Sequence, residues 1–506
     1  MPIERELRFT SEDLEQFAAA SGDRNPLHTD PEFAAGTSFG APVVHGALIT
    51  IAMLGAMPAS ALGAIRSLRT SFSGALLRGA SATATACALE REHGAWEIRL
   101  TARGRTLARV VARQTDESRL SVTASQAPIG AMRTSPAAPS ATELAAGHAL
   151  RGHYESGPEL EALAQRFGAA GVDPRLLDGL AWSSYVVGME LPGLHSLFAS
   201  LTLSVEDELA QDGSRQTLVV RDHDERTGQL TIDGLLAARS GEGGAAARIQ
   251  CFALAATALP DPVALGLDRA SEEDRGAVIV AGGSRGFGAS LTLALLALGH
   301  EVHVAYATSQ QRAAELLRLA GPHASRLHLV RADLRDPAAM QSLSDTVVGA
   351  GSPLVGLVLN AAPPPLAMSL TAQSATELAD YVATSLRLFA VPLGSLLGQV
   401  DEQHGWVLFC SSSAVTVPPR DWPHYVAAKG AVEGLAQWVA TTRPRLRTVI
   451  LRPPKMLTAM TGTPSGRIGA ASADAVALWT AEKLAGGELE AGVTVLEPPA
   501  REVAAA

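Results

Sequence analysis

Over roughly the first quarter of the chain, stretches of alternating hydrophobic and polar residues surround one longer apolar segment. The apolar segment, about 47–57, predicts a buried helix, and Thr10 or Ser11 is a suitable N-cap for an earlier helix that runs to Ala20. Strand-like segments are expected at 4–9, 65–72, 81–90, 96–102 and 107–114. The pattern predicts an α+β domain in which antiparallel strands wrap one helix.

A second and weaker version of this pattern follows. An apolar helix is expected over 176–189, and residues 193–201 parallel residues 64–72 in sequence. Further strand-like segments are expected at 216–222, 229–237 and 246–254. A repeated pattern of this kind predicts two similar halves that pack as a pseudo-dimer within one chain.

From about residue 273 onward, the pattern changes to short, wholly apolar strands that alternate with helices. Such strands are expected at 277–280, 302–306, 327–330, 354–359 and 406–410. Their alternation with helices predicts a Rossmann-type, doubly wound parallel sheet, which makes the chain a multidomain α/β plus α+β protein. The expected domains are 1–125, 148–258 and 273–506, separated by linkers at 126–147 and 259–272.

The composition fits a multidomain protein with substantial cores. The chain has 506 residues, 47% of them hydrophobic, and a net charge of −10 without a long basic run, which argues against a nucleic-acid partner. The three cysteines, Cys87, Cys251 and Cys410, are far apart, which fits a reducing compartment and no metal site. The N-terminus is charged, and glycines interrupt the apolar stretch 42–64, so we expect a cytoplasmic protein without a membrane partner.

A glycine-rich turn joins the strand at 277–280 to an apolar helix expected over 289–298. Its spacing is Gly-x-x-x-Gly-x-Gly, with Gly282, Gly286 and Gly288. Glycines let the backbone bend sharply and approach a pyrophosphate, and the helix N-terminus presents free N–H groups and the positive end of its dipole. The turn therefore indicates a dinucleotide site, although glycine turns also occur for structural reasons alone.

A tyrosine and a lysine further along the chain are one helical turn apart. Tyr425 and Lys429 therefore share a helix face, and Ser412 precedes the tyrosine just after a predicted strand. With the glycine turn, this order resembles the short-chain dehydrogenase/reductase family over about residues 273–500. The resemblance includes two polar positions that follow strands, Asp333 and Asn360.

This resemblance implies three catalytic side chains. Tyr425 would protonate a carbonyl oxygen as hydride reaches the carbon, Lys429 would stabilise the phenolate and hold the nicotinamide ribose, and Ser412 would bind the substrate oxygen. The residues implied to bind the cofactor are Gly282, Ser284, Arg285, Gly286, Phe287, Gly288, Thr308, Ser309, Asp333, Asn360, Tyr425, Lys429 and Thr458.

The residues around the glycine turn bear on the choice of cofactor. The strand at 302–306 is followed by Ala-Thr-Ser, without the acidic residue that binds the ribose 2′-hydroxyl in NAD enzymes. Arg285 could pair with a 2′-phosphate, or it could be a solvated turn residue. The turn is similar to that of NADPH-dependent 3-ketoacyl thioester reductases, which implies NADPH. Two departures from the family pattern are Ser385, where an asparagine is frequent, and Pro454, where a glycine is usual.

Asp23 and His28 are the candidate chemistry of the first domain. They are separated by Asn-Pro, which favours an extended, turning backbone, so that both side chains can converge on one water. In isolation they could equally be a turn residue and a surface imidazole. Residues 21–49, however, resemble the (R)-specific enoyl-CoA hydratases, the MaoC-like group of hot-dog proteins. This resemblance implies that Asp23 and His28 are catalytic, that the N–H of Gly46 binds the thioester oxygen, and that His45 is structural.

The same resemblance implies a double hot-dog fold for the first two domains. No aspartate and histidine with the spacing of Asp23 and His28 precede the second predicted helix. We therefore expect the second copy to be catalytically silent, and to support the first copy or shape its acyl tunnel.

Together the two resemblances imply a bifunctional enzyme of fatty-acid or polyketide-type biosynthesis. NADPH would reduce a 3-ketoacyl thioester to the (3R)-hydroxyacyl thioester, and the hot-dog domain would remove water to give the trans-2-enoyl thioester. The thioester would be carried on coenzyme A or an acyl carrier protein, and a homodimer is expected by analogy. Three alternatives stay open: hydration followed by oxidation, a non-catalytic acyl-binding hot-dog domain, and a silent NADP-binding reductase domain.

Overall fold

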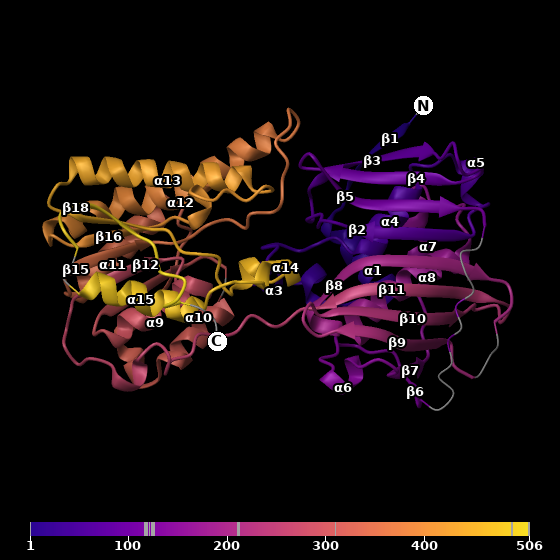
Figure 1. Cartoon of the computed structure of the whole chain (residues 1–506), viewed down its shortest axis with the longest axis horizontal. Coiled ribbons are helices and arrows are strands. Elements are labelled where there is room, and N and C mark those ends of the chain that lie inside the picture. Colours follow the sequence, from indigo (N-terminus) through magenta and orange to yellow (C-terminus); the bar gives the residue numbers. More distant parts are fainter. Residues whose placement is uncertain are drawn as a thin grey trace. The chain divides into compact units, whose positions relative to one another are not determined.

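The computed structural model describes residues 2–115, 120, 122, 127–209, 213–308, 310–486 and 489–503. Its contacts divide the chain into two compact units (Figure 1). Unit 1 comprises Met1–Ala34 and Ala41–Ala256, and unit 2 comprises Ala35–Gly40 and Thr257–Ala506. Each unit has its own sheet and its own hydrophobic core.

The first half of unit 1 consists of one strand, a group of helices and four further strands. The helices are α1 (Ser11–Ser21), α2 (Pro26–Thr29), α3 (Pro31–Ala35), α4 (Gly46–Leu54) and α5 (Ala59–Leu62). The strands are β1 (Ile3–Arg8), β2 (Ser67–Phe72), β3 (Ser81–Ala88), β4 (Trp96–Ala102) and β5 (Arg105–Arg113). Their spatial order is β1-β3-β4-β5-β2, and each neighbouring pair is antiparallel.

The second half of unit 1 has the same strand order. Its helices are α7 (Glu159–Arg166) and α8 (Pro174–Tyr185), and α8 continues into a π-helical turn, Val186–Glu190. Its strands are β7 (Ala149–Gly152), β8 (Ser196–Glu206), β9 (Gln216–Asp224), β10 (Gln229–Ala237) and β11 (Gly244–Ala253), in the order β8-β11-β10-β9-β7. Antiparallel pairing of β2 with β8 joins the halves into one sheet.

The helices α4 and α8 pack against each other at the centre of the unit 1 core. Every residue of α4 after Gly46 is buried, as expected for a helix that is apolar on all sides. The helix ends at Leu54, earlier than the sequence predicts, and Gly55 is its C-cap residue. A Cβ atom at Gly55 would lie 1.7 Å from the carbonyl oxygen of Phe167.

The segment expected as the first linker carries regular structure within its described residues. The short strand β6 (Ile129–Gly130) pairs in parallel with β7, and helix α6 (Ala141–Leu144) is capped by Ser140. Ala137 and Leu144 are buried. Elements of two and four residues are too short to leave a hydrophobic period in the sequence, so composition alone suggested a linker.

Unit 2 contains a parallel sheet of seven strands in the order β14-β13-β12-β15-β16-β17-β18 (Figure 1). The strands are β12 (Ala277–Ala281), β13 (Glu301–Tyr306), β14 (Leu327–Arg331), β15 (Leu354–Leu359), β16 (Trp406–Cys410), β17 (Arg447–Leu451) and β18 (Gly492–Leu496). The strand order reverses between β12 and β15, which confirms the predicted doubly wound sheet. In such sheets ligands bind outside the carboxyl ends of the strands at this switch point.

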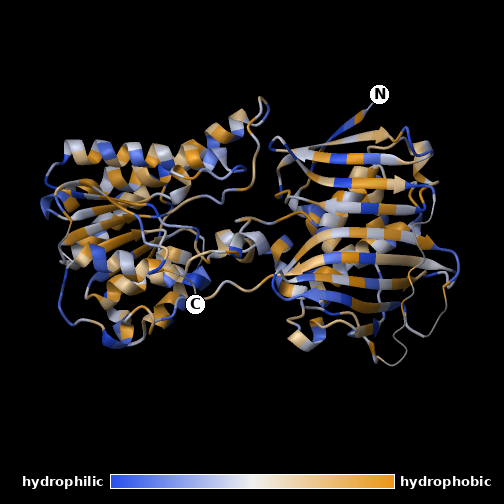
Figure 2. Cartoon of the chain, viewed as in Figure 1, coloured by the Kyte–Doolittle hydropathy of each residue, from blue (hydrophilic) through white to orange (hydrophobic). Residues whose placement is uncertain are grey.

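Helices cover both faces of this sheet. They are α9 (Gly286–Ala297), α10 (Gln310–Ala320), α11 (Pro337–Ala350), α12 (Ala375–Glu402), α13 (Pro423–Thr442), α14 (Pro464–Arg467) and α15 (Ala473–Ala485). One core cluster joins the sheet to α9, α10 and α15, and another joins it to α11, α12 and α13. All residues of β12 and β16 are buried, so these strands are continuous hydrophobic runs (Figure 2).

Residues 257–272 belong to unit 2, although most of this stretch was expected to be a linker. It contains a 3-10 turn, Leu267–Arg269, and it places Leu265 and Leu267 in the hydrophobic core beside α9. Two buried leucines in a proline-containing stretch give no periodic signal, which explains the difference.

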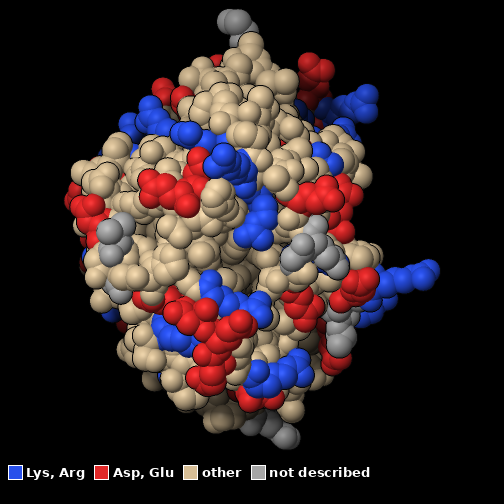
Figure 3. Space-filling view, turned by 90° about the vertical axis from the view of Figure 1, so that its left-hand side faces the viewer, with Lys and Arg blue, Asp and Glu red and all other residues tan. Residues whose placement is uncertain are grey.

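Among the described helices, α12 has the length and composition of a membrane span. In unit 2 it packs against α13, α11 and β15, and Phe389, Leu393 and Leu396 belong to the core. Acidic and basic side chains are interspersed on the face shown in Figure 3.

Candidate functional site

The loop that carries Asp23 lies between α1 and α2 in unit 1. Gly22 ends α1 in the left-handed conformation, with φ of 72°, and Asn25 caps α2 by accepting from the N–H of Leu27. The chain is extended at Asn25, before Pro26, as the sequence predicts. Asp23 is 2% exposed, and its Oδ1 accepts a hydrogen bond from the N–H of Asn25 at 3.2 Å. The aspartate is therefore a buried, oriented carboxyl group and not a surface turn residue.

The imidazole of His28 faces this carboxyl group. Its Nδ1 lies 2.7 Å from the carbonyl oxygen of Val43, so Nδ1 carries a proton and Nε2 is the nitrogen that can exchange one. One side-chain oxygen or nitrogen from each of Asp23, His28 and His45 lies within 4.8 Å of the others. The structure thus brings together the two residues that the sequence singles out for proton transfer.

His45 is the N-cap residue of α4 and is fully buried. Burial, and secondarily the charge of His28, lower the pKa of His45 well below its ordinary value. The neutral ring lies with Nε2 3.3 Å from the backbone carbonyl oxygen of Asp23, so Nε2 is the donor. His45 therefore supports the loop.

Gly46 begins α4, so its N–H is one of the amides that have no acceptor within the helix. A Cβ atom at this position would lie 2.9 Å from the ring of Phe72. The N-terminus of α4, with its positive dipole end, follows His45, whose ring stacks on that of His28.

Burial raises the pKa of the Asp23 carboxyl group, and the charge of His28 and hydrogen bonds from Ser184 and Asn25 act in the opposite direction. Opposing influences of this kind are typical of carboxyl groups that act in general acid–base catalysis. Ser184 comes from α8, in the half of unit 1 that has no Asp–His pair of its own.

Unit 2 has a cleft of about 1600 Å³, including space open to solvent, at the carboxyl ends of its strands. The predicted residues that line it are Gly282, Ser284, Arg285, Gly286, Phe287, Thr308, Asp333, Asn360, Tyr425, Lys429 and Thr458. Ser309 lies outside the described residues. The cleft therefore gathers residues from segments that are far apart in the sequence, at the switch point of the sheet.

The glycine turn has two left-handed residues, Gly282 with φ of 85° and Gly286 with φ of 53°. Gly288 does not line the cleft, although we expected it to bind the cofactor. It is a packing position, because a Cβ atom there would lie 2.2 Å from the carbonyl oxygen of Gly282. The side chain of Asn360 donates to the same carbonyl at 3.0 Å, and so fixes the turn against β15.

Tyr425 and Lys429 lie one turn apart on α13 and both are buried at the cleft. The Nζ atom of Lys429 lies 5.7 Å from the centre of the Tyr425 ring and donates to the carbonyl of Cys410 at 2.6 Å. A small cavity beside them is lined by Tyr425, Lys429 and Ser385. The ammonium group is thus held close to the phenol that is expected to transfer a proton.

Ser412 is not among the residues that line the cleft. It caps a short 3-10 turn after β16, where its Oγ accepts from the N–H of Ala414 at 3.1 Å. Its neighbour Ser411 does line the cleft, but its Oγ donates to Glu433 at 2.6 Å. Because the Ser412 oxygen is an acceptor in the cap, its hydroxyl proton stays available for a substrate oxygen.

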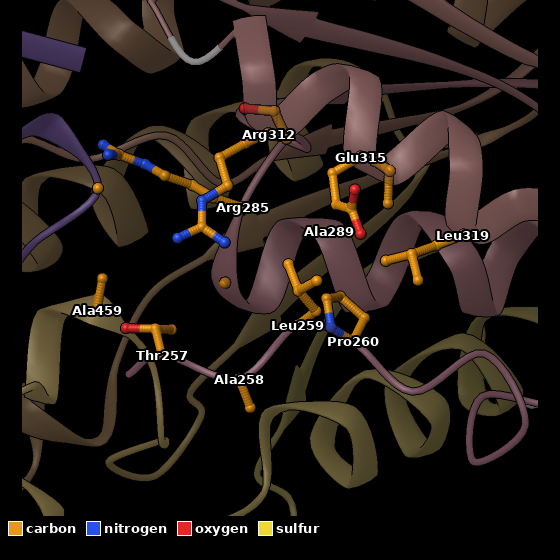
Figure 4. Close-up of a pocket in the computed structure, with 14 residues that line it drawn as sticks. Thr257, Ala258, Leu259, Pro260, Arg285, Ala289, Arg312, Glu315, Leu319 and Ala459 are labelled. Carbon is orange, nitrogen blue, oxygen red and sulfur yellow. The ribbon is translucent and has the colours of Figure 1, made fainter. Parts of the chain in front are cut away.

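Two arginines, Arg285 and Arg312, line a neighbouring pocket, which is shown in Figure 4. Arg285 comes from the glycine turn, where its guanidinium donates to the carbonyl of Ala35, and Arg312 comes from the first turn of α10. Glu315 lines the same pocket, so its lining residues carry two positive charges and one negative charge, and the pocket favours an anion. Arg312 was not predicted, because nothing in the sequence shows that α10 brings its first turn to the glycine turn.

Asp333 lines the cleft but is paired with Arg335, a second arginine that the sequence did not single out. The guanidinium of Arg335 donates to both carboxylate oxygens at 2.9 and 2.8 Å. Hydrogen bonds from Arg335 lower the pKa of Asp333. The carboxylate therefore stays ionised and fixed at the edge of the cleft.

The residues of this cleft fit a nicotinamide dinucleotide. Gly286 is the first residue of α9, so the helix presents free N–H groups where a pyrophosphate binds. The backbone can approach closely at Gly286, because a Cβ atom there would meet nothing nearer than Thr458 at 3.5 Å. Tyr425 and Lys429 line the same cleft, at the place where the nicotinamide ring is expected.

Comparison with known proteins identifies this unit. The family model for short chain dehydrogenases matches residues 276–466. An uncharacterized oxidoreductase of Mycobacterium tuberculosis is 32% identical over 202 residues, which cover 38% of this chain and 73% of that relative. The chain belongs to the short chain dehydrogenase family. The tyrosine, lysine and glycine turn described above are thus parts of an oxidoreductase domain.

Solved dehydrogenase structures are similar to part of the chain. An alcohol dehydrogenase of Thermococcus sibiricus, complexed with 5-hydroxy-NADP, is 19% identical with a TM-score of 0.40, and the match covers 44% of this chain and 96% of that chain. A short chain dehydrogenase of Burkholderia cenocepacia in complex with NADP is 25% identical with a TM-score of 0.39, over 44% of this chain and 97% of that chain.

The same chain carries a MaoC-like domain. The family model for that domain matches residues 2–103, which include Asp23, His28 and Gly46. An (R)-specific enoyl-CoA hydratase of Aeromonas caviae is 55% identical over 42 residues, or 8% of this chain. The chain spans about 31% of the length of that relative. One polypeptide thus combines a short chain dehydrogenase domain with a MaoC-like hydratase or dehydratase domain.

Proposed function

We propose that the protein is a bifunctional enzyme of fatty-acid or polyketide-type biosynthesis. Unit 2 reduces a 3-ketoacyl thioester to the (3R)-hydroxyacyl thioester with NADPH, and unit 1 dehydrates that product to the trans-2-enoyl thioester. One observation carries the proposal: a complete Tyr425–Lys429 pair and a complete Asp23–His28 pair occur in the same chain, each at a site that suits its chemistry.

In the reductase step, bound NADPH supplies the hydride. Tyr425 donates its phenolic proton to the carbonyl oxygen, and Lys429 stabilises the phenolate that this leaves. The hydroxyl group of Ser412 donates a hydrogen bond to the same oxygen and orients the ketone. A water in the cavity lined by Ser385 and Lys429 would return a proton to the phenol.

In the dehydratase step, Asp23 and His28 share the proton work. One removes a proton from C2 and the other protonates the leaving hydroxyl at C3, so that a C–H and a C–O bond break and the double bond and one water form. The N–H of Gly46 at the start of α4 stabilises the negative charge that develops on the thioester oxygen.

The anion pocket supports the choice of NADPH. Arg285 and Arg312 both line it, and an NADPH 2′-phosphate would satisfy the two positive charges. Since NADPH is the usual reductant of biosynthesis, this choice favours reduction over oxidation. The two relatives, an oxidoreductase and an (R)-specific enoyl-CoA hydratase, fit the two steps.

The repeated strand order of unit 1 supports a double hot-dog fold, with α4 and α8 as the two central helices. Tethering the two activities raises the effective concentration of the hydroxyacyl intermediate at the second site. We place the enzyme in the cytoplasm, acting on a coenzyme A or carrier-protein thioester, and expect a homodimer.

The test is anaerobic incubation with acetoacetyl-CoA and NADPH, with NADH in parallel. Nucleotide absorbance and mass spectrometry of the thioesters should show NADPH consumption and both hydroxyacyl and enoyl products. Tyr425→Phe should abolish both products, whereas Asp23→Asn should abolish only the enoyl product. Faster turnover of crotonyl-CoA with NAD would instead establish the oxidative direction. Unchanged activities in both Asp23→Asn and His28→Ala would show that the hot-dog domain only binds the acyl group.

A further inference from the structure

Ser184, in the second half of unit 1, contacts the catalytic aspartate of the first half. Its Oγ donates to the Oδ2 atom of Asp23 at 2.7 Å, and the two residues are 161 positions apart in the sequence. Ser184 is 3% exposed and Asp23 is 2% exposed, so water does not compete for this hydrogen bond. The contact lies inside unit 1, at the C-terminal end of α8.

The chain around Ser184 is shaped to receive the Asp23 loop. The side chain of Asn25 donates to the carbonyl oxygens of Gly188 and Gly193 at 3.2 and 3.1 Å. A Cβ atom at Gly188 would lie only 2.1 Å from the Oδ1 atom of Asp23. The backbone of the π-helical turn after α8 therefore approaches the carboxylate too closely to leave room for a side chain at Gly188.

These contacts fix both oxygens of the carboxylate. Oδ1 accepts from the N–H of Asn25 and Oδ2 accepts from Ser184, so the carboxyl plane cannot rotate without losing one hydrogen bond. A hydrogen bond donated to a carboxylate favours the charged form, which opposes the effect of burial. Ser184 thus influences both the direction of the carboxyl group and the pH at which it ionises.

We infer that Ser184 is a positioning residue for Asp23, and that the half of unit 1 without a catalytic pair completes the dehydratase site. This inference rests on the proposed hydratase–dehydratase function. Ser184 acts through Asp23, and the proton transfers themselves stay with Asp23 and His28. The second half is then necessary for catalysis as well as for the core.

The test compares Ser184→Ala with Ser183→Ala in the full chain, using hydration of crotonyl-CoA between about pH 5 and 9. Ser183 is an equally buried neighbour, and its Oγ donates to the carbonyl of Leu180 at 2.8 Å. We expect kcat to fall about tenfold to a hundredfold in Ser184→Ala with little change in KM, because a hydrogen bond to a charged group is lost. The limb of the pH profile that reports Asp23 should move to higher pH, by about one unit. Ser183→Ala should show neither change.

Two further variants distinguish the loss of the hydrogen bond to Asp23 from a folding defect. Ser184→Thr keeps the hydroxyl group and should restore most of the rate, and Gly188→Ala should lower it by displacing the carboxylate. Ketone reduction by unit 2 serves as the reference activity for each preparation. An inactive wild-type hydratase would overturn the proposed function and the inference with it. An active wild type whose Ser184→Ala variant behaves like Ser183→Ala would overturn the positioning role alone.

Discussion

The imidazole rings of His28 and His45 stack with their centroids 3.7 Å apart and their planes inclined by 24°. Two rings this close cannot both carry a charge cheaply, and the environment divides the roles between them. His45 is fully buried at the start of α4, whereas His28 is only half-buried. The stack therefore holds the ring of His28 against a ring that stays neutral.

Replacing His45 should change how the stability of unit 1 depends on pH. Because burial holds the pKa of His45 far below 6.5, the unfolded chain binds a proton below about pH 6.5 that the folded chain does not. The free energy of unfolding should therefore fall as the pH decreases below that value, by up to about 1.4 kcal/mol per unit. Above it, the contribution of His45 is constant.

The matched variant is His45→Gln, which keeps an amide donor for the carbonyl of Asp23. Burial raises the pKa of Asp23, so Asp23 changes the free energy of unfolding with pH in the opposite direction to His45. The contribution of His45 is therefore the difference between wild type and variant in the slope of this free energy against pH. Hydrogen exchange of peptides from α4 is measured against urea concentration at pH 7.5 and 5.5. It gives the free energy of unfolding of unit 1 separately from that of unit 2. If the free energy of unfolding had the same slope against pH in wild type and in His45→Gln, His45 would be protonated in the folded protein.

Removing the phenol of Tyr425 should stop ketone reduction and leave hydration intact. The loss of a general acid lowers kcat by about 10² to 10⁴, so Tyr425→Phe should be nearly inactive with acetoacetyl-CoA and NADPH. Trp438→Phe is the control, because Trp438 lies on the same helix, α13, is 55% exposed and does not line the cleft. Parallel assays with crotonyl-CoA report unit 1. A comparable loss in both variants would point to a packing defect.

Much of unit 2 could be predicted because its signals are local. The glycine turn, the apolar strands and the Tyr425–Lys429 spacing each lie within one element, where the backbone geometry fixes which residues meet. The Asp23–His28 pair was also found, since a short loop before α4 brings both residues to one point.

The remaining site residues depend on contacts between distant elements, which spacing cannot show. Ser184 meets Asp23 only because β2 and β8 join the halves of unit 1. Arg312 and Arg285 line the same pocket because α10 begins near the glycine turn. Ser412 was predicted from spacing, but that spacing does not reveal that Ser411 is the serine lining the cleft.

Two neighbouring serines can be distinguished by their existing hydrogen bonds. Ser411 already donates to Glu433, whereas Ser412 accepts from Ala414 and keeps its own proton for the ketone oxygen. Ser412→Ala should therefore lower kcat/KM for the ketone by about 10² to 10³, the usual cost of one oxyanion donor. Ser411→Ala should stay within a few-fold of wild type and lose some thermal stability. Steady-state kinetics with saturating NADPH would reveal the reverse order if Ser411 binds the substrate.

Arg312 should matter for NADPH and not for NADH. It lines the anion pocket with Arg285, and the loss of one charge-assisted hydrogen bond to a phosphate raises KM by about tenfold or more. We expect this increase for NADPH in Arg312→Ala and a larger one in the double variant with Arg285→Ala. KM for NADH should be unchanged, because NADH lacks the 2′-phosphate. Arg326→Ala is the control, since Arg326 contacts His323 in the turn after α10 and does not line the pocket. If KM rose equally for both nucleotides, the arginines would be supporting the glycine turn and the 2′-phosphate would bind elsewhere.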